Sequence, residues 1–439
     1  MDDELINSAH LSLSRKSRLP GAGFFYPDSV DDDDEDTHEA VANADVVVIA
    51  DADADGLGCV ALLREMYDAT IAWDAFEPVV ANRVTRWERG TDSTHTTDET
   101  TDASTDDPSS ELTKISQETE TEVEVENEHN NKDEDEDIVS TSSPESAVAL
   151  ITASPYSIDD ALSTVAMEAP VGVDVYICDL CPDEFNWIET ELTAVADRAE
   201  TVAWYDHHQW DSSTADAVRD CGVELVIGAS DEECSTDVAL RSLPYEFESQ
   251  WSELATVTRD HDLWIKEDAR SDDLADYAYW APPEEYATVV GTYGADLPTL
   301  ASRYLELRRV EKNALIDAAV DRAELTTVGP WTVGITYGRC SQNEVAETLR
   351  SQGADAAVVV KPAGSASIRG SETFERAHEV AGRLNGGGHP RAAGCKPDIY
   401  DDMLDYAHHW TTEGSPAKHI ILQAFEEVAA SLETDPNSS

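Results

Sequence analysis

The feature that most constrains the fold is a set of three short apolar segments, each of which ends in acidic residues. The three segments and their acids are residues 44–50 with Asp51, Asp53 and Asp55, residues 173–178 with Asp179, and residues 201–205 with Asp206. Valine, isoleucine and aromatic residues dominate them, which is typical of strands buried in a parallel sheet. Because the carboxyl ends of parallel strands meet at one edge of the sheet, these carboxylates are expected to lie together where ligands bind in such folds.

Strands of this kind alternate with helix-like segments along most of the chain. We expect two further strands at 147–153 and 224–227, and helices at 59–67, 157–167, 185–198, 235–243 and 248–259. The alternation predicts an α/β fold with a doubly wound, mostly parallel sheet. The same alternation starts again beyond Gly329 and Pro330 and predicts a second, smaller α/β unit.

These patterns divide the chain into five segments. They are a polar lead-in (1–40), a larger α/β domain (41–296) that contains an acidic disordered insertion (91–145), a long connector helix (297–328), a smaller α/β domain (329–412), and a C-terminal helix with its tail (413–439). The insertion is assigned as disordered because its Thr, Ser, Asp and Glu residues are too polar to bury a core. The last helix either docks or mediates association, so the oligomeric state stays open.

Acidic residues dominate the composition of the chain. It holds 92 acidic and 29 basic residues in 439, a formal net charge of −63, and only 19 of the acids and 2 of the bases lie in 91–145. A dispersed, lysine-poor acidic surface suits a protein that works in high salt, where self-repulsion is screened within about 3 Å at 1 M. This composition predicts a haloarchaeal source. A partly disordered acidic protein is the alternative, but it fits 91–145 alone.

Cysteine usage and the N-terminus bear on the cellular compartment. The seven cysteines form no disulfide-like framework, and Cys178 with Cys181 lacks the second pair that a zinc site would need. The first residues show no charged head followed by an apolar core, and no apolar run approaches the roughly 20 residues of a membrane helix. We expect a cytoplasmic protein with no membrane partner.

The clustered acids and two histidines point to a metal site. Asp53 and Asp55, together with Asp179, His207 and one further acid, supply enough hard ligands for two divalent ions that act on a phosphoryl group. For the further acid we prefer Asp260, with Asp262 as the alternative, because a helix brings both to its end. A calcium loop starting at Asp51 is disfavoured, because Leu62 stands where its last glutamate belongs.

A glycine-rich segment near the end of the chain predicts an anion site. Consecutive glycines let backbone N–H groups converge on an anion, and nearby cationic side chains add charged donors. The residues that we assign to substrate binding are Gly386, Gly387, Gly388, His389, Arg391 and Arg369. Residues 361–396 hold six Lys/Arg and three Asp/Glu, a local excess of positive charge in a strongly acidic chain. A flexible glycine-rich turn is the alternative.

Together these segments resemble the DHH phosphoesterase superfamily, most closely its RecJ-like branch. The resemblance lies in five segments, namely Asp51–Gly56 for the first motif, Asp179 for the second, Asp206-His207-His208 for the third, Asp260 for the fourth, and Asn385–Gly394 for the GGGH segment of the DHH-associated C-terminal domain. It spans about residues 44–410 apart from the insertion. It implies a larger domain that binds two Mn²⁺ or Mg²⁺ ions, with Mn²⁺ preferred, and a cleft between domains in which phosphodiesters are hydrolysed.

The resemblance also implies roles for individual residues. The implied metal ligands are Asp53, Asp55, Asp179, His207 and Asp260 (or Asp262). His208 would contact the scissile phosphate or assist the leaving group, and Asp206 would be a ligand or would orient a histidine. Asp51 stands where several relatives carry histidine, so we place it with His208 and Asp206 in the catalytic group. The fourth motif, residues 259–264, is more similar to that of short-oligonucleotide nucleases than to that of RecJ.

The leading hypothesis is a metal-dependent exonuclease of single-stranded DNA or RNA or of short oligonucleotides. The acidic surface disfavours long nucleic acid at low salt, which makes a short substrate attractive. Hydrolysis of a cyclic dinucleotide or small phosphate ester is a second hypothesis. A third hypothesis is a replication-associated scaffold without activity, for which replication or repair proteins are the expected partners.

Overall fold

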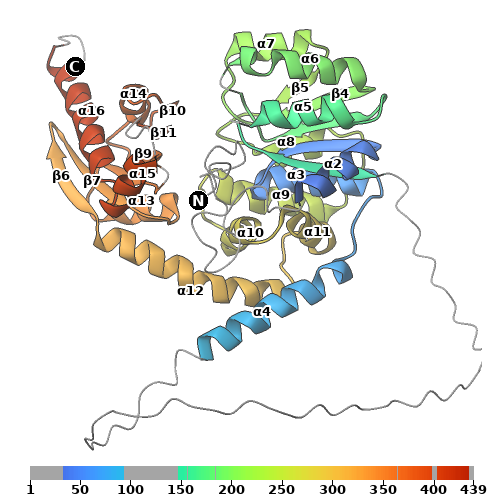
Figure 1. The fold of residues 1–439 in the computed structure, drawn as a ribbon, viewed down its shortest axis with the longest axis horizontal. Helices are drawn as coiled ribbons and strands as arrows, with labels where there is room; N and C mark the ends of the chain where they lie inside the picture. Colours follow the sequence, from blue (N-terminus) through green and yellow to red (C-terminus); the bar gives the residue numbers. More distant parts are fainter. Residues whose placement is uncertain are drawn as a thin grey trace, which may run out of the picture.

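The computed structural model describes residues 33–92, 147–155, 157–182, 184–362, 364–397 and 403–434 (Figure 1). Most of the predicted lead-in and acidic insertion therefore lies outside the described residues. At their borders the structure contains two helices that the sequence patterns did not predict, α2 (Asp33–Ala42) and α4 (Glu77–Asp92). Among the described residues, no helix combines the length and the apolar character that a membrane crossing requires.

A five-stranded parallel sheet forms the centre of the larger lobe and confirms the predicted fold class. Its strands are β1 (Val46–Asp51), β2 (Val148–Ala153), β3 (Asp174–Cys178), β4 (Thr201–Asp206) and β5 (Glu224–Ile227). Every neighbouring pair is parallel, and the strand order is β2-β1-β3-β4-β5. The direction of winding therefore reverses between β1 and β3, and ligands of doubly wound sheets bind outside the carboxyl ends of the strands at such a point.

Helices cover both faces of this sheet. Besides α2 they are α3 (Ala54–Met66), α5 (Ile158–Glu168), α6 (Glu189–Arg198), α7 (Ser212–Asp220), α8 (Ser235–Ser242), α9 (Ser249–Asp262), α10 (Ala269–Trp280) and α11 (Pro283–Tyr293). Alternate residues of β1 point to opposite faces of the sheet. Val47 and Ile49 pack against α5 and α6 on one face, and Val46 and Val48 pack in the core with α3, α9 and α11 on the other. The apolar run of β1 thus reflects burial on both sides.

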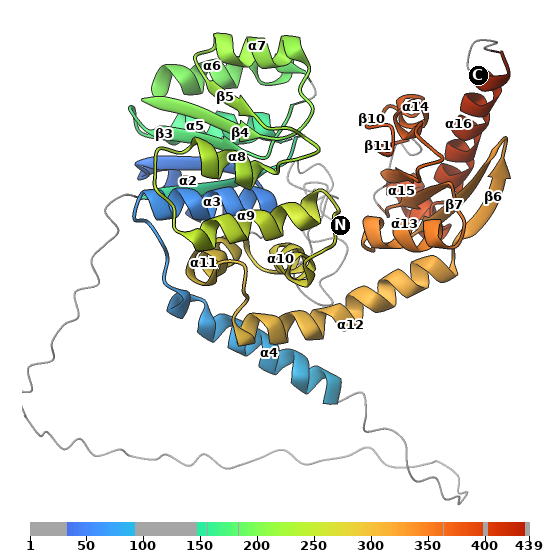
Figure 2. The same ribbon diagram turned by 180° about the vertical axis from the view of Figure 1, so that it is seen from behind.

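A long helix, α12 (Thr299–Asp321), runs from the larger lobe to the smaller one, as Figure 2 shows from behind. It packs against α4, and the buried Arg308 guanidinium lies 3.6 Å from the ring centroid of Trp280 and 4.9 Å from that of Trp87. The predicted connector helix (297–328) is too long, because the helix ends at Asp321. Its expected last residues instead form β6 (Glu324–Val328), an edge strand of the second sheet that pairs antiparallel with the next strand, Trp331–Tyr337.

The smaller lobe holds a six-stranded mixed sheet with the order β10-β11-β9-β8-β7-β6. Its elements are β6 (Glu324–Val328), β7 (Trp331–Tyr337), α13 (Gln342–Ser351), β8 (Ala356–Val360), β9 (Ala366–Gly370), α14 (Ala377–Gly382), β10 (Gly387–Gly388), β11 (Ala392–Cys395), α15 (Met403–Thr411) and α16 (Ser415–Thr434). Only β7 and β8 pair in parallel. The last helix docks on this sheet, because Ile421 and Phe425 are fully buried in its core beside Phe374.

Candidate metal centre

The first acidic segment is a tight connection from β1 to α3. The strand ends at Asp51, and the Asp53 carboxylate caps the helix by accepting hydrogen bonds from the N–H groups of Asp55 (2.9 Å) and Gly56 (3.1 Å). A Cβ at Gly56 would lie 2.4 Å from the Asp51 carbonyl oxygen, so only glycine permits this turn. The helix therefore begins five residues before the predicted start at 59, and Asp55 lies in its first turn rather than in a loop.

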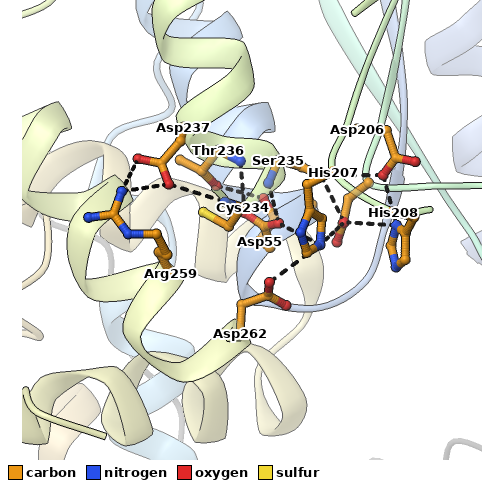
Figure 3. A network of polar contacts seen from close by, with 12 residues as sticks. Asp55, Asp206, His207, His208, Cys234, Ser235, Thr236, Asp237, Arg259 and Asp262 are labelled. Atoms are coloured by element: carbon orange, nitrogen blue, oxygen red, sulfur yellow. Dashed lines mark hydrogen bonds and ion pairs between the residues drawn. The ribbon is translucent and has the colours of Figure 1, made fainter. Parts of the chain in front are cut away.

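The N-terminus of α8 fixes the Asp55 carboxylate, as Figure 3 shows. Asp55 is 1% exposed and accepts hydrogen bonds from the N–H groups of Ser235 (2.6 Å) and Thr236 (2.8 Å). These free N–H groups at a helix start favour a negative charge. The sequence reasoning did not assign Ser235 and Thr236 to the site. The sequence does mark the start of this helix, because an acid at position 237 stands three residues after the cap position 234. In the structure Asp237 accepts a hydrogen bond from the Cys234 N–H at 3.1 Å.

Asp179 lies at the switch point between β1 and β3. Its φ of 59° is in the left-handed region, which aspartate tolerates better than most residues and which turns the side chain out of the direction of β3. The Oδ1 atom accepts a hydrogen bond from the Ser235 hydroxyl at 2.9 Å and lies 3.7 Å from His207 Nε2. The side chain is 3% exposed, so the carboxylate is held in a buried position that faces the other acids.

His207 is the point on which the carboxylates converge. Its Nε2 atom lies 3.3 Å from Asp262 Oδ2, 3.7 Å from Asp179 Oδ1 and 4.0 Å from Asp55 Oδ2. The ring is buried, and among the described residues neither His207 Nδ1 nor Asp262 Oδ2 has a hydrogen-bond partner. Three carboxylates facing one imidazole nitrogen, with a buried oxygen left unpaired, are the donor set of a divalent cation.

The structure brings Asp262, and not the preferred Asp260, to this cluster. Helix α9 continues through Asp262, so the last turn directs the two acids differently. Asp260 accepts hydrogen bonds from the N–H groups of Glu267 (2.9 Å) and Asp268 (3.2 Å) and thereby closes the loop after the helix. Burial alone would raise the pKa of Asp260, but the nearby Ser271 hydroxyl and the hydrogen bonds from these two N–H groups lower it. Sequence spacing could not separate the two acids, because both belong to the same helix end.

The electrostatics of the cluster call for a cation. Burial, followed by the charges of Asp55 and Asp53, raises the pKa of both Asp179 and Asp262 well above their ordinary values. Among the residues that the structure describes, three groups have donor atoms within 4.8 Å of one another, namely Asp55 with His207 and Asp262, Asp179 with His207 and His208, and Asp51 with Asp53 and Asp179. The groups overlap in His207 and Asp179. Oxygen and imidazole donors of this kind fit Mn²⁺ or Mg²⁺, with Asp179 common to two adjacent positions.

Asp206 and His208 form a separate pair at the edge of the cluster. The fully buried Asp206 interacts through Oδ1 with His208 Nδ1 at 2.8 Å, and through Oδ2 it accepts a hydrogen bond from Trp210 Nε1 at 2.6 Å. Burial would lower the pKa of His208, but the hydrogen bond and the charge of Asp206 raise it to about 9. With both oxygens engaged inside the protein, Asp206 is positioned to orient His208, whose other nitrogen is left to meet a ligand.

A cationic patch lies on the smaller lobe, and we define it as Arg350, Lys361 and Arg369. Burial, followed by the neighbouring positive charge, lowers the pKa of Lys361 (through Arg369) and of Arg369 (through Arg350). Arg369 donates to Asn343 Oδ1 at 2.9 Å and to backbone carbonyls, and Arg350 donates to the Gly370 carbonyl at 3.0 Å. Within the described residues, none of the three cations has a carboxylate partner.

The predicted backbone nest for an anion is wrong for this segment. Gly387 and Gly388 form β10, which pairs with β11, and the N–H groups of Gly386 and His389 donate to the carbonyls of Ala381 (3.0 Å) and Ala392 (2.7 Å). A Cβ at Gly388 would lie 2.6 Å from the Ala392 carbonyl oxygen, and its φ is +133°. These glycines therefore permit a close hairpin, whose exposed tip carries His389 and Arg391.

The hairpin tip lies near the metal cluster although it belongs to the other lobe. Burial, then the charge of His208, lowers the pKa of His389. Helix α12 also ties the lobes together, because Lys312 Nζ lies 2.5 Å from Asp276 Oδ1 on α10 and 2.9 Å from Glu344 Oε2 on α13. The two lobes that carry the predicted site residues are thus connected through α12, and the charges of His208 and His389 interact between them.

No protein-family model matches the sequence, and no curated protein matches it. Similar solved structures include exonuclease RecJ bound to manganese, which is 12% identical with a TM-score of 0.45 and coverage of 87% of this chain and 94% of that one. RecJ in complex with Mn²⁺ from Thermus thermophilus is 12% identical, with a TM-score of 0.44 and coverage of 90% and 55%. A pGpG-specific phosphodiesterase from Vibrio cholerae is 10% identical, with a TM-score of 0.40 and coverage of 85% and 98%. These values are too low to transfer an activity.

Proposed function

We propose that this protein is a metal-dependent phosphodiester hydrolase that acts on the end of single-stranded nucleic acid or on short oligonucleotides. The observation that carries the proposal is the convergence of Asp55, Asp179 and Asp262 on His207 Nε2, within 3.3–4.0 Å, at the switch point of a parallel sheet. The motif resemblance to the DHH phosphoesterases supports the same reaction.

The donor set supports two divalent ions, Mn²⁺ or Mg²⁺, because the three groups of donors overlap. Asp179 belongs to two of these groups, and His207 belongs to two of them. Asp55, His207 and Asp262 would hold one ion, and Asp51, Asp53 and Asp179 would hold the other. Ions bound there would supply Lewis acidity toward the phosphate and lower the pKa of a bound water. Ser235 and Thr236 keep Asp55 and Asp179 oriented through hydrogen bonds of 2.6–2.9 Å.

His208 is the group that we assign to the leaving oxygen. Asp206, itself held by the Trp210 N–H, holds the His208 ring by its Nδ1 side, and the His208 side chain is 41% exposed, so Nε2 can reach a substrate. A proton held at Nε2 would pass to the oxygen that leaves the phosphorus. The orienting carboxylate favours the protonated ring, which is the form that this role needs.

The cationic patch and the hairpin tip would bind the next phosphate of the substrate. Arg369, Lys361 and Arg350 lack carboxylate partners among the described residues of a chain of net charge −63, which leaves their charge available to an anion. A substrate with two or more phosphates would thus reach both lobes, whereas a single small ester would use only the metal cluster.

The test is hydrolysis of end-labelled single-stranded DNA and RNA, from dinucleotides to about 30-mers, in about 2–3 M KCl with Mn²⁺, where charges are screened within about 3 Å or less. Mononucleotide release from one labelled end would support an exonuclease and give its polarity. A rate that falls steeply with length would favour an oligonucleotide scavenger. Hydrolysis of cyclic dinucleotides alone would replace the proposed substrate, and no hydrolysis of any diester would contradict the proposed function.

A further inference from the structure

An open cavity of about 660 Å³ lies beside His208, and apart from His208 its wall lies outside the motifs on which the proposed function rests. It lies between the loop from β4 to α7 and the loop from β5 to α8. Its wall includes His208, Trp210, Ala215, Arg219, Ile227 and Gly228. This volume is in the range of small-molecule sites. Its wall combines the Trp210 ring and the aliphatic Ala215 and Ile227 with a larger number of polar side chains, among them His208, Gln209, Ser212, Arg219 and Asp231.

The aromatic side of the cavity is rigid. The Trp210 ring is half-buried, stands at 84° to the buried Trp204 ring with centroids 5.1 Å apart, and donates its N–H to Asp206 at 2.6 Å. An indole fixed by two contacts loses little further freedom when a planar ligand stacks on it. Ala215 and Ile227 add aliphatic surface to the same cavity, so a flat ring can stack there while its polar edge meets the polar part of the wall. Asp216 and Asp231 in the wall disfavour a phosphate.

The rim of the cavity can pair with the polar edge of such a ring. Arg219 and Asp216 lie there with their charged ends 3.5 Å apart, and their side chains are 43% and 79% exposed. They offer donors and acceptors side by side, which is how the edges of nucleobases are recognised. A nucleobase has both the flat face and the polar edge that this cavity would match.

The position of the cavity relates it to the reaction. His208 lines the cavity, and its ring nitrogen lies within 4.8 Å of donor atoms of Asp179 and His207 in the acidic cluster. We propose that the cavity is a nucleobase subsite, which binds the base of a nucleotide attached to the scissile phosphate by stacking on Trp210. This inference rests on the proposed function and adds to it the recognition of one base at a defined side of the scissile bond.

The experiment uses three dinucleotides with the full-length protein: one with both bases, one with an abasic sugar at the 5′ position and one with it at the 3′ position. For the wild type, one of the two abasic substrates should show a KM about 5- to 150-fold higher, which is the loss of one base-stacking contact of about 1–3 kcal/mol. Trp210→Ala should show the same rise with the complete dinucleotide and no further rise with that abasic substrate, because the two changes remove one contact.

Trp210→Phe is the matched control for the hydrogen bond to Asp206. Both Trp210 variants lose this bond and should share any fall in kcat, but Trp210→Phe keeps an aromatic face and should hold KM near the wild-type value. Trp187→Ala removes another partly exposed indole, 46% exposed and outside the cavity, and should leave KM unchanged. Arg219→Ala, at the exposed rim, should raise KM for the base-containing substrate less than Trp210→Ala does.

Two results would contradict the proposed subsite. One is a wild-type KM that is equal for all three dinucleotides. The other is a rise in KM in Trp210→Ala that is as large with the abasic substrate as with the complete dinucleotide, because independent contacts would then have been removed. If the wild type hydrolyses none of them, the proposed function fails, and equilibrium binding of AMP and GMP then tests the subsite by itself. Weaker binding by Trp210→Ala than by Trp210→Phe would support it, and equal binding would refute it.

Discussion

The metal cluster and the cationic patch are built from opposite kinds of unpaired charge. In the cluster, Asp55, Asp179 and Asp262 face His207, and the described part of the chain places no lysine or arginine in ion-pair contact with them. In the patch, Arg350 and Arg369 meet only backbone and amide oxygens of the residues that the structure describes. Many cations elsewhere are paired with carboxylates, as Arg270 is with Glu253, Asp268 and Asp296. Arg198 and Arg322 are exceptions that donate to backbone carbonyls.

Unpaired charge that is partly or fully buried is costly, so its survival in two places indicates that ligands of opposite sign complete them. A cation would relieve the repulsion among the carboxylates of the cluster, and an anion would neutralise the patch. A phosphodiester is the kind of ligand that satisfies both, because its phosphates bind metal ions and arginine alike. The comparison can be tested by removing the unpaired charge from one region at a time.

The largest effect is expected for Asp179→Asn. Asparagine tolerates the left-handed backbone at this position and keeps the shape of the side chain, so the change removes mainly the charge. Metal content measured by mass spectrometry should fall and turnover should drop to background, while the melting temperature of the metal-free protein should rise because repulsion is relieved. Full metal content in this variant would contradict the assignment of the cluster.

His208→Asn should have the next largest effect. Loss of a proton donor at the leaving oxygen is expected to lower kcat by about 10²–10⁴-fold, with metal content unchanged. Steady-state kinetics beside metal analysis measures both quantities. Asn is chosen because its amide can still meet Asp206, so that the buried carboxylate keeps a partner. A loss of metal together with activity would instead make His208 a ligand.

Arg369→Ala should raise KM while leaving metal content and kcat nearly unchanged. One charged hydrogen bond to a phosphate is worth about 1.5–3 kcal/mol, which corresponds to about 10- to 150-fold in KM. Arg369→Lys should recover part of this loss. The matched control is Arg303→Ala, because Arg303 is exposed and already paired with Glu88 and Glu306, and its removal should leave KM as it is.

The smallest effect on the reaction is expected for Asp260→Asn. Its carboxylate receives two backbone N–H groups, so the substitution should cost about 1–3 kcal/mol of stability and leave metal content near the wild-type value. Asp262→Asn should do the reverse, with metal lost and stability kept. Chemical denaturation and metal analysis of the two variants would show which of the two acids binds metal. Metal loss in Asp260→Asn alone would support Asp260, the ligand that the sequence favours.

Much of the fold could be predicted because burial leaves a strong local pattern. The apolar run of β1 reports a strand covered on both faces, and the predicted ranges of β4 and β5 agree closely with the observed strands. Helix α4, whose sequence is largely polar, was missed. It is stabilised by packing against α12 and by the contact of Trp87 with Arg308. The buried side of α4 leaves only a short helical stripe, because Val80, Val84 and Trp87 recur at spacings of four and three residues within an otherwise largely polar sequence.

What the sequence determined by itself was the kind of chemistry, because acids at strand ends must gather where parallel strands end. It predicted Asp55, Asp179 and His207 as neighbours although more than 150 residues separate the first from the last. What only the tertiary structure decided was direction: which of Asp260 and Asp262 faces the cluster, and that the start of α8 holds Asp55. A one-dimensional pattern records which residues share an element, whereas the orientation of each side chain depends on the elements packed against it.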